Sequence, residues 1–366
     1  SMRAVLDHFW QLLTQEEQTV FQKQAVFRGG FTREAYEEVT GANLAMLSQF
    51  LDKSAIHFNE DGRYRRPSLM AQYARVRLQE NSTLYTKTRE CHARYFSKFV
   101  KRLEGEFFGG QPQKAMAPFL ADLANIRFAW EWAVEHHNAE IFNDMADTFM
   151  QAFDFAGLYR DAYDLAQHAT ASLLLLADPI TEDVTLAKGR VMGLAGAFLF
   201  RLGEYKQSLD WCQQSMQTLE EVRPHIAYAH SFVYAGAAEF GLGDMENVVT
   251  YWQKAAKGYQ AANSEWGFMT ANSNLAEVFN ALGRYEEGKS SAEHALTLAR
   301  KMHNLESIGS ASTSLAFLAL QDGKYSEATQ FAEEALRSHQ QVGHDAHIAN
   351  SLAVLAQIAS KQNNPD

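Results

Sequence analysis

The chain has 366 residues, of which 46% are hydrophobic and 21% are charged, and its formal net charge is −11. This composition is typical of a folded protein and excludes a disordered chain. No apolar run approaches the roughly 20 residues of a membrane-spanning helix, and two distant cysteines cannot form a disulfide framework. The acidic balance disfavours nucleic acid as a partner, since it is also an anion. We therefore expect a cytoplasmic protein with several domains or an extended repeat array.

The first eighty residues have the signals of short helices followed by a hairpin. Thr14–Glu17 has the pattern of a capping box, Thr32 is a second N-cap candidate, and a third helix is expected at about 43–51. The dipeptide Asp61-Gly62 then predicts the tight turn of a short hairpin. Helices followed by such a hairpin predict a winged-helix domain over residues 1–80.

A basic stretch surrounds and follows the expected hairpin. Residues 60–106 contain eleven Lys or Arg and six Asp or Glu. Three of the arginines and one tyrosine lie next to the expected hairpin tip, namely Arg63, Arg65, Arg66 and Tyr64. They would either contact DNA phosphates or dock this domain on another protein domain. Because the rest of the chain is acidic, we favour docking. Residues 81–138 are expected to form a helical spacer.

The C-terminal half repeats with a period of 40 residues. A glycine recurs at this interval, at Gly203, Gly243, Gly283 and Gly323. Seven positions before each glycine lies a small residue, at Gly196, Gly236, Ala276 and Ala316. A glycine tolerates the positive φ of a turn between two antiparallel helices, and small residues allow helices to approach closely. The pattern therefore predicts a stack of helical hairpins.

This order of small residue, turn glycine and following aromatic residue resembles the tetratricopeptide repeat, whose usual period is about 34 residues. We expect such repeats over residues 139–366, with helices or turns that are longer than usual. The resemblance implies a right-handed superhelix in which the first helix of each hairpin faces a groove. The expected fold is thus mostly α, with a winged-helix domain, a helical spacer and a repeat superhelix.

Eleven residues of the first helices are expected to face this groove, and we call them the groove strip. They are Arg190, Phe200, Arg201, His230, Phe240, Thr270, Ser273, Glu277, Ser310, Phe317 and Asn350. The phenylalanines are candidate anchors for a ligand, and the charged residues are candidate polar contacts. Alternatively, the rings pack within their own superhelix and the polar side chains are only solvated. A clamp for a peptide carboxylate is not expected, because it needs Lys and Asn where this groove has Gly, Val, Ser, Thr and Ala.

The N-terminal third resembles STAND signalling ATPases in several short sequence segments. The similar segments are Leu12–Gln18, Ala25–Phe31, Leu51–Ser54, Arg63-Tyr64, Gln72–Ala74, His92, Tyr95-Phe96, Asn125–Arg127 and Ala129–Ala133. The resemblance implies a bacterial regulator of transcription or signalling, in which the repeats hold an ATPase domain of the same chain inactive until a protein or small-molecule inducer binds. Many members carry a Met-His-Asp triplet that contacts the nucleotide. This chain has Arg66-Pro67-Ser68 there, so nucleotide sensing from this position is not expected.

No catalytic, cofactor or metal site is expected in this chain. It contains no G-x-x-x-x-G-K-[ST] phosphate loop, so an ATPase domain would have to lie upstream. The start at Ser1-Met2-Arg3 agrees with a piece of a longer protein. We therefore interpret the chain as a non-catalytic sensor region. Two alternatives remain, a self-contained repeat adaptor or scaffold, and a winged-helix DNA-binding protein with a repeat arm.

Overall fold

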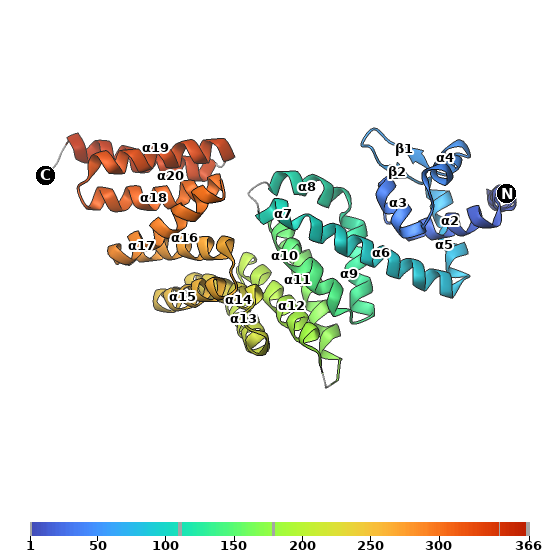
Figure 1. Cartoon of the computed structure of the whole chain (residues 1–366), viewed down its shortest axis with the longest axis horizontal. Helices are drawn as coiled ribbons and strands as arrows, with labels where there is room; N and C mark the ends of the chain where they lie inside the picture. The colour runs from blue at the N-terminus through green and yellow to red at the C-terminus, as the bar shows by residue number, and fades with distance from the viewer. Residues whose placement is uncertain (1, 109–111, 178–179, 344, 364–366) are drawn as a thin grey trace. The chain divides into compact units, whose positions relative to one another are not determined.

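The computed structural model describes residues 2–108, 112–177, 180–343 and 345–363, which are almost entirely helical (Figure 1). Contacts divide the chain into two compact units. The N-terminal unit holds the described residues up to Gly105, together with Gln113–Phe155 and Ala171–Leu176, and the repeat unit holds the others. No helix of the described ranges is long and apolar enough to cross a lipid bilayer.

The N-terminal unit begins with short helices whose starts follow the capping signals in the sequence. The Thr14 hydroxyl accepts a hydrogen bond from the Glu17 amide at 3.2 Å, and the Glu17 carboxylate accepts one from the Thr14 amide at 2.8 Å. The Thr32 hydroxyl caps the start of the next α-helix, where it accepts a hydrogen bond from the Ala35 amide at 3.1 Å. The elements of this unit are α1 (Met2–Gln11), α2 (Gln15–Lys23), η1 (Gln24–Val26), α3 (Arg33–Thr40), α4 (Leu44–Asp52), β1 (His57–Phe58), β2 (Tyr64–Arg65), α5 (Ser68–Gln79), α6 (Ser82–Arg102), α8 (Pro112–Ala121), α9 (Leu123–Glu135) and α10 (Ala139–Phe155).

A small antiparallel hairpin occupies the predicted position. β1 and β2 pair with Phe58 opposite Tyr64, and Gly62 at the turn has a φ of 75°. Phe31 adds an isolated bridge, since it exchanges two backbone hydrogen bonds with Tyr64, at 2.9 and 3.0 Å. The hairpin is therefore tied to the segment between η1 and α3.

Aromatic rings fill the interior of the N-terminal unit. Phe21 on α2 and Phe50 on α4 are fully buried, with ring centroids 6.1 Å apart. Between α9 and α10, Trp130 stacks on Phe149 at 4.4 Å. Rings of this size remove much apolar surface from water, so they stabilise the unit strongly.

His92 on α6 is a buried polar group within this aromatic interior. Its Nε2 atom lies 3.3 Å from Oδ1 of Asn125, which also accepts from the Arg28 amide at 2.7 Å. An amide oxygen can only accept, so the Nε2 atom carries the proton. Burial, and then the charges of Arg89 and Arg28, lower the pKa of His92 to about 3. The ring is therefore neutral at physiological pH.

The buried His92 should make stability depend on pH in one window. The unfolded chain protonates this residue near its ordinary pKa of 6.5, whereas the folded protein does so only near pH 3. Its contribution is therefore present above pH 6.5 and is lost as the pH falls towards 3. Between about pH 7.5 and about pH 5 we expect a loss of about 2 kcal/mol in the free energy of unfolding from this group.

Urea unfolding of the wild type and of His92→Gln at the two pH values measures this loss. The variant should lose about 2 kcal/mol less than the wild type over the interval, because glutamine does not titrate. Equal losses in the two proteins would contradict the assignment of a neutral, buried His92.

The repeat unit consists of helical hairpins, and we call their members first and second helices. The first helices are α12 (Glu182–Arg201), α14 (Ile226–Leu242), α16 (Glu265–Ala281), α18 (Leu305–Gln321) and α20 (Asp345–Asn363). The second helices are α13 (Tyr205–Leu219), followed by η2 (Glu220–Val222), α15 (Met245–Ala261), α17 (Tyr285–Lys301) and α19 (Tyr325–Val342). Residues of α7 (Glu104–Phe108) and α11 (Tyr159–Leu174) fall in both units.

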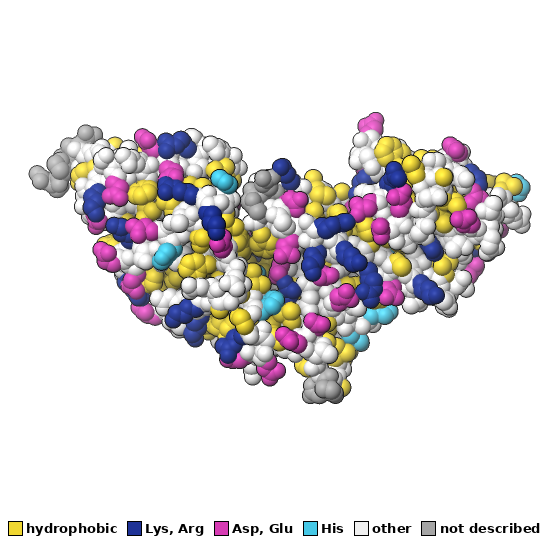
Figure 2. Space-filling view, viewed as in Figure 1, with side chains coloured by type: hydrophobic (Ala, Val, Ile, Leu, Met, Phe, Trp, Pro, Cys, Tyr) yellow, Lys and Arg dark blue, Asp and Glu magenta, His cyan; other side chains and the backbone are white. Residues whose placement is uncertain are grey.

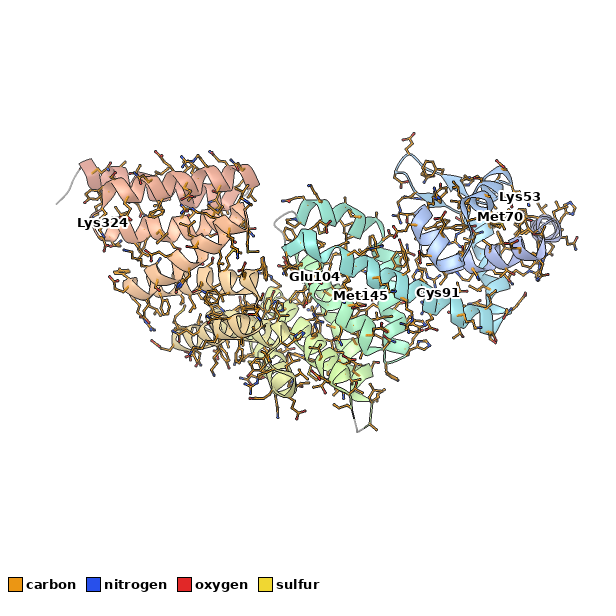
Figure 3. The ribbon with its side chains drawn as sticks, in the orientation of Figure 1. Lys53, Met70, Cys91, Glu104, Met145 and Lys324 are labelled. Carbon is orange, nitrogen blue, oxygen red and sulfur yellow. The ribbon has the colours of Figure 1, made fainter. Side chains whose placement is uncertain are left out.

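The turns inside the hairpins confirm the predicted period. All four predicted turn glycines have a positive φ, between 71° at Gly323 and 88° at Gly243. Lys324 follows Gly323 in the turn between α18 and α19, and it pairs with Asp322 of the same turn at 2.9 Å (Figure 3). The turns could be predicted from the sequence because each one requires a positive φ at a single residue, which favours glycine there.

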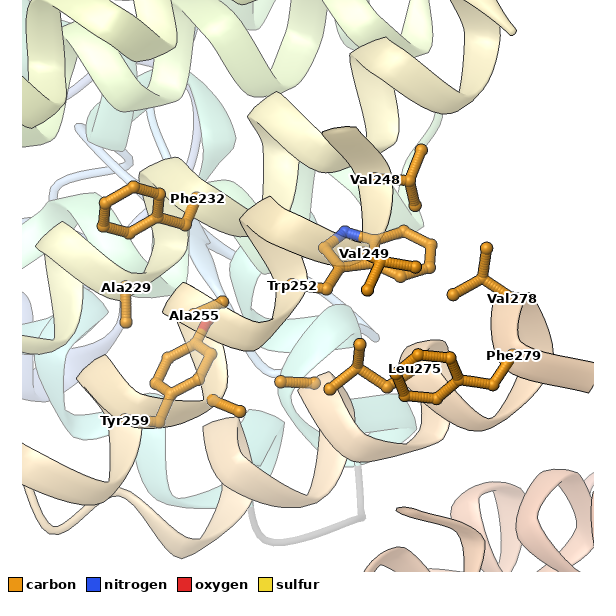
Figure 4. Close-up of a cluster of buried hydrophobic side chains, with 12 residues drawn as sticks. Ala229, Phe232, Val248, Val249, Trp252, Ala255, Tyr259, Leu275, Val278 and Phe279 are labelled. Carbon is orange, nitrogen blue, oxygen red and sulfur yellow. The ribbon is translucent and has the colours of Figure 1, made fainter. Parts of the chain in front are cut away.

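The close crossing of the two helices in a hairpin depends on the sizes of the facing side chains. A Cβ atom added to Gly236 on α14 would lie 2.5 Å from the ring of Trp252 on α15. The Trp252 ring donates a hydrogen bond to the Val233 carbonyl at 3.0 Å and belongs to a large apolar cluster (Figure 4). One period later, Ala276 and Ala292 occupy the equivalent positions, both fully buried. The glycine and tryptophan of one hairpin thus occupy the positions that two alanines occupy in the next.

We expect Gly236→Ala to lower the free energy of unfolding by about 1–3 kcal/mol, because the new methyl group must displace the Trp252 ring. Alanine by itself favours a helix over glycine by up to about 1 kcal/mol. In a Trp252→Ala background, the same substitution should therefore stabilise the protein. Urea unfolding of the four proteins of this cycle gives the coupling energy, and additive effects would disprove the size constraint.

Candidate partner-binding surface

The first helices of the repeat unit form one continuous row. α12 packs on α14, and α14, α16, α18 and α20 continue this series, whereas successive second helices pack mainly on first helices rather than on one another. An array that is tighter along one row of helices curves around that row. The first helices therefore line the inner wall of the repeat unit.

All eleven residues of the groove strip lie on first helices, as expected. Arg201, Phe240, Glu277 and Asn350 are exposed, His230 is buried, and the other residues of the strip are half-buried. The strip consists of Arg190, Phe200 and Arg201 on α12, His230 and Phe240 on α14, Thr270, Ser273 and Glu277 on α16, Ser310 and Phe317 on α18, and Asn350 on α20.

The three phenylalanines of the groove strip have different surroundings. Phe240 is 51% exposed, which is unusual for a side chain of this size. Phe200 is half-buried, with its ring 6.0 Å from that of Tyr205, and Phe317 is half-buried, with its ring 6.4 Å from that of Tyr285. Phe240 is therefore the aromatic residue of the strip that is most available to a ligand.

Several polar groups of the strip already have partners within the repeat unit. The His230 ring meets the edge of Tyr259 at 5.5 Å, and the Thr270 hydroxyl donates to the Trp266 carbonyl at 3.0 Å. The Ser273 hydroxyl is buried and has no hydrogen-bond partner among the described residues. For His230 and Thr270, internal packing accounts for the side chain without a ligand.

A cavity of about 430 Å³ lies between α15, α16 and α17, and none of the residues that line it belongs to the groove strip. The sequence analysis did not predict this cavity. Its walls come from separate helices, as the approach of Phe268 to His294 shows, with ring centroids 6.2 Å apart, and no pattern of neighbouring residues indicates such a contact. Within the described ranges, no group of three or more His, Cys, Asp or Glu side chains is placed to hold a metal ion. The cavity is lined by Gln260, Asn263, Ser264, Glu265, Phe268, His294, Thr297 and Leu298.

Arg63, the first of the predicted docking residues, is held inside the N-terminal unit. It is 8% exposed, and its two terminal nitrogens contact the Asp122 carboxylate at 2.5 and 2.9 Å. One of these nitrogens also donates to the Gly30 carbonyl at 3.0 Å. Asn125 donates to the same carbonyl at 3.1 Å and to Asp122 at 2.8 Å. This buried network ties the hairpin to α9.

The other three predicted docking residues differ in exposure. Tyr64 lies in β2 and is half-buried. Arg65 is exposed and pairs with Asp61 of the hairpin turn at 2.7 Å. Arg66 is half-buried and donates to the Phe27 carbonyl at 2.8 Å. Of the four residues, Arg65 presents the most accessible charge.

Removing Asp122 should leave the Arg63 charge buried without a counter-charge. We expect Asp122→Ala to lower the free energy of unfolding by about 3–5 kcal/mol. The matched control is Arg65→Ala, which breaks an exposed pair and should cost less than about 1 kcal/mol. Urea unfolding monitored by circular dichroism compares the two variants, and similar losses would contradict a structural role for the buried pair.

The basic surplus of the N-terminal unit is partly neutralised along α6. Arg94 pairs with Glu90 at 3.0 Å and with Glu140 at 2.9 Å, and Lys101 pairs with Asp144 at 2.5 Å. Figure 2 shows Lys and Arg side chains interspersed with Asp and Glu on the visible face. A nucleic-acid-binding face usually has a basic stripe instead.

Comparisons with known proteins agree with the geometry of the repeat unit. A family model described as tetratricopeptide repeat matches residues 267–338, which include most of α16 and all of α17 and α18. A comparison with curated protein sequences gives no significant match. Residues 267–338 of the repeat unit therefore contain tetratricopeptide-type hairpins, within a longer series of helical hairpins.

Several solved structures are similar to this chain at low sequence identity. A Signal Transduction ATPase with Numerous Domains (STAND) protein with a tetratricopeptide repeat sensor, from Pyrococcus horikoshii, is 14% identical with a TM-score of 0.54, and the match covers 97% of this chain and 55% of that one. BtubC from P. vanneervenii is 13% identical (TM-score 0.49, 59% of this chain and 90% of that one). A Rap protein complexed with Competence and Sporulation Factor is also 13% identical (TM-score 0.47, 73% and 85%).

The similarity to the STAND structure concerns the fold. This chain spans about half the length of that protein, as the coverage of 55% shows. Stacked helical repeats present extended surfaces that commonly bind protein partners, and they are generally non-catalytic. The repeat unit therefore has the architecture of a protein-interaction sensor or adaptor.

Proposed function

We propose that this chain is the sensor region of a STAND-type signal-transduction ATPase or transcriptional regulator. Residues 1–80 would form its winged-helix domain, residues 81–138 its spacer and residues 139–366 its repeats. The proposal is supported by the STAND-like segments of the N-terminal third and by the similarity in fold over 97% of the chain to a STAND protein with a repeat sensor. An ATPase domain of the same chain would lie upstream.

In this proposal a protein or small-molecule inducer binds along the groove strip. The observation that carries it is the 51% exposed Phe240 on an inner wall of directly packed first helices. A ligand that bridges two first helices favours one crossing angle between them. It thereby shifts the population of repeat curvatures, and the ATPase responds to that shift.

Phe240→Ala and Arg190→Ala should each weaken the binding of peptides selected on this chain from a random library at least tenfold, because an anchor of this kind contributes more than about 1.4 kcal/mol. Matched controls are Phe58→Ala, which removes an aromatic residue that is 58% exposed in the N-terminal unit, and Arg337→Ala, which removes an exposed arginine of a second helix. Fluorescence polarisation measures the dissociation constants. Unchanged affinity in both groove variants would remove the groove strip from consideration.

The self-contained adaptor differs from the STAND proposal in what precedes this chain in the native protein. A phosphate loop there supports the STAND-type regulator, whereas its absence favours an adaptor. The DNA-binding alternative needs accessible arginines beside the hairpin. It is weakened by the buried pair of Arg63 with Asp122 and by the pairing of Arg65 with Asp61.

A further inference from the structure

An aromatic residue from outside the hairpins packs on a first helix of the repeat unit. Phe108, the last residue of α7, has its ring centroid 4.8 Å from that of Trp266 near the start of α16, and the two ring planes are 85° apart. Both residues belong to the repeat unit. Aromatic rings favour this edge-to-face arrangement, because the positive edge of one ring meets the negative face of the other. The two rings therefore make a specific contact.

Trp266 lies on the face of α16 that carries the groove strip. Thr270, Ser273 and Glu277 follow it at intervals of four, seven and eleven residues. Because an α-helix has about 3.6 residues per turn, each of these intervals returns to within about 40° of the same direction. Phe108 thus covers the inner wall one helical turn before Thr270.

The contact between Phe108 and Trp266 is only partly closed off from water. Both residues are half-buried, although the neighbouring Phe107 is only 5% exposed. Glu106, on the other side of Phe107, is exposed. One half-buried aromatic pair is a weak contact in comparison with the buried anchors of a complete peptide interface. A peptide with an aromatic side chain can therefore replace Phe108 on Trp266.

We propose that Trp266 receives an aromatic side chain of a peptide partner, and that Phe108 occupies this place in the free chain. The proposal deepens the function proposed above, and it rests on that function only in that a peptide binds the inner wall. Phe108 indicates the chemistry of the partner, since a phenylalanine ring already fits there edge to face. A binding peptide must displace Phe108, so its apparent affinity is reduced to the extent that the place is occupied.

Fluorine NMR of the chain labelled with fluorotryptophan tests the contact without a ligand. The Trp266 resonance is identified by its loss in Trp266→Phe. We expect Phe108→Ala to shift this resonance, because it removes the ring beside the indole. The control Phe58→Ala removes an exposed ring of the N-terminal unit and should leave the resonance unchanged. An unshifted Trp266 resonance in Phe108→Ala would overturn the proposal, whereas the binding function of the groove strip would be unaffected.

Fluorescence polarisation with peptides selected on this chain from a random library tests the displacement. Phe108→Ala should bind these peptides about fivefold more tightly than the wild type, because one competing aromatic pair is removed. Trp266→Ala should bind them at least tenfold more weakly, because it removes the receiving ring. The matched control is Trp211→Ala, which removes a half-buried tryptophan of α13 and should bind like the wild type. Circular dichroism spectra establish that the variants are folded.

The variants of the groove strip separate this proposal from the proposed function. If Phe240→Ala and Arg190→Ala keep the wild-type affinity while Phe108→Ala and Trp266→Ala behave as expected, the peptide binds at Trp266 and only the groove strip fails. Equal affinity of the wild type and Phe108→Ala, or of the wild type and Trp266→Ala, would overturn the present proposal, whatever the groove variants show.

Discussion

The repeat unit depends on how closely the two helices of each hairpin can cross. At the crossing, the chain places pairs of side chains whose combined size is limited. Gly236 faces Trp252, while Ala276 and Ala292 occupy the equivalent positions one period later. A large residue on one helix therefore requires glycine on the other, and this exchange keeps the crossing close although the residues change. Regular stacking, and with it a continuous inner wall, follows from this constraint.

Because the close crossings stabilise each hairpin, side chains elsewhere on the first helices are not needed for its packing. Phe240 illustrates this, since it leaves half of its surface in water while Phe232 and Trp252 are buried in the interior of the same hairpin. An exposed ring at such a place lowers solubility without adding to the core. A ligand that covers it would remove this apolar surface from water, which is the physical reason for proposing that a ligand binds on the inner wall.

The sequence was informative where a structural requirement is local. A turn glycine needs its own positive φ, and a capping threonine acts on an amide three residues away, so the repeats, the capped helix starts and the hairpin could be predicted. The environment of Arg63 could not, because its partner Asp122 is 59 residues distant and nothing in the neighbouring residues distinguishes it from the exposed Arg65. The cavity beside Phe268 could not be predicted for the same reason, since its walls come from three helices that are separate in the sequence.

The polar interior of the N-terminal unit links a buried histidine to a nearby excess of positive charge. Asn125 holds the Arg28 backbone through its amide oxygen, and the same oxygen keeps the proton on Nε2 of His92. Arg28 then lies against Phe128, next to Arg89, so positive charge accumulates beside a buried imidazole. A second proton on that ring would add to this repulsion, so the ring stays neutral. The neutral histidine is thus a response of the structure to this excess of positive charge.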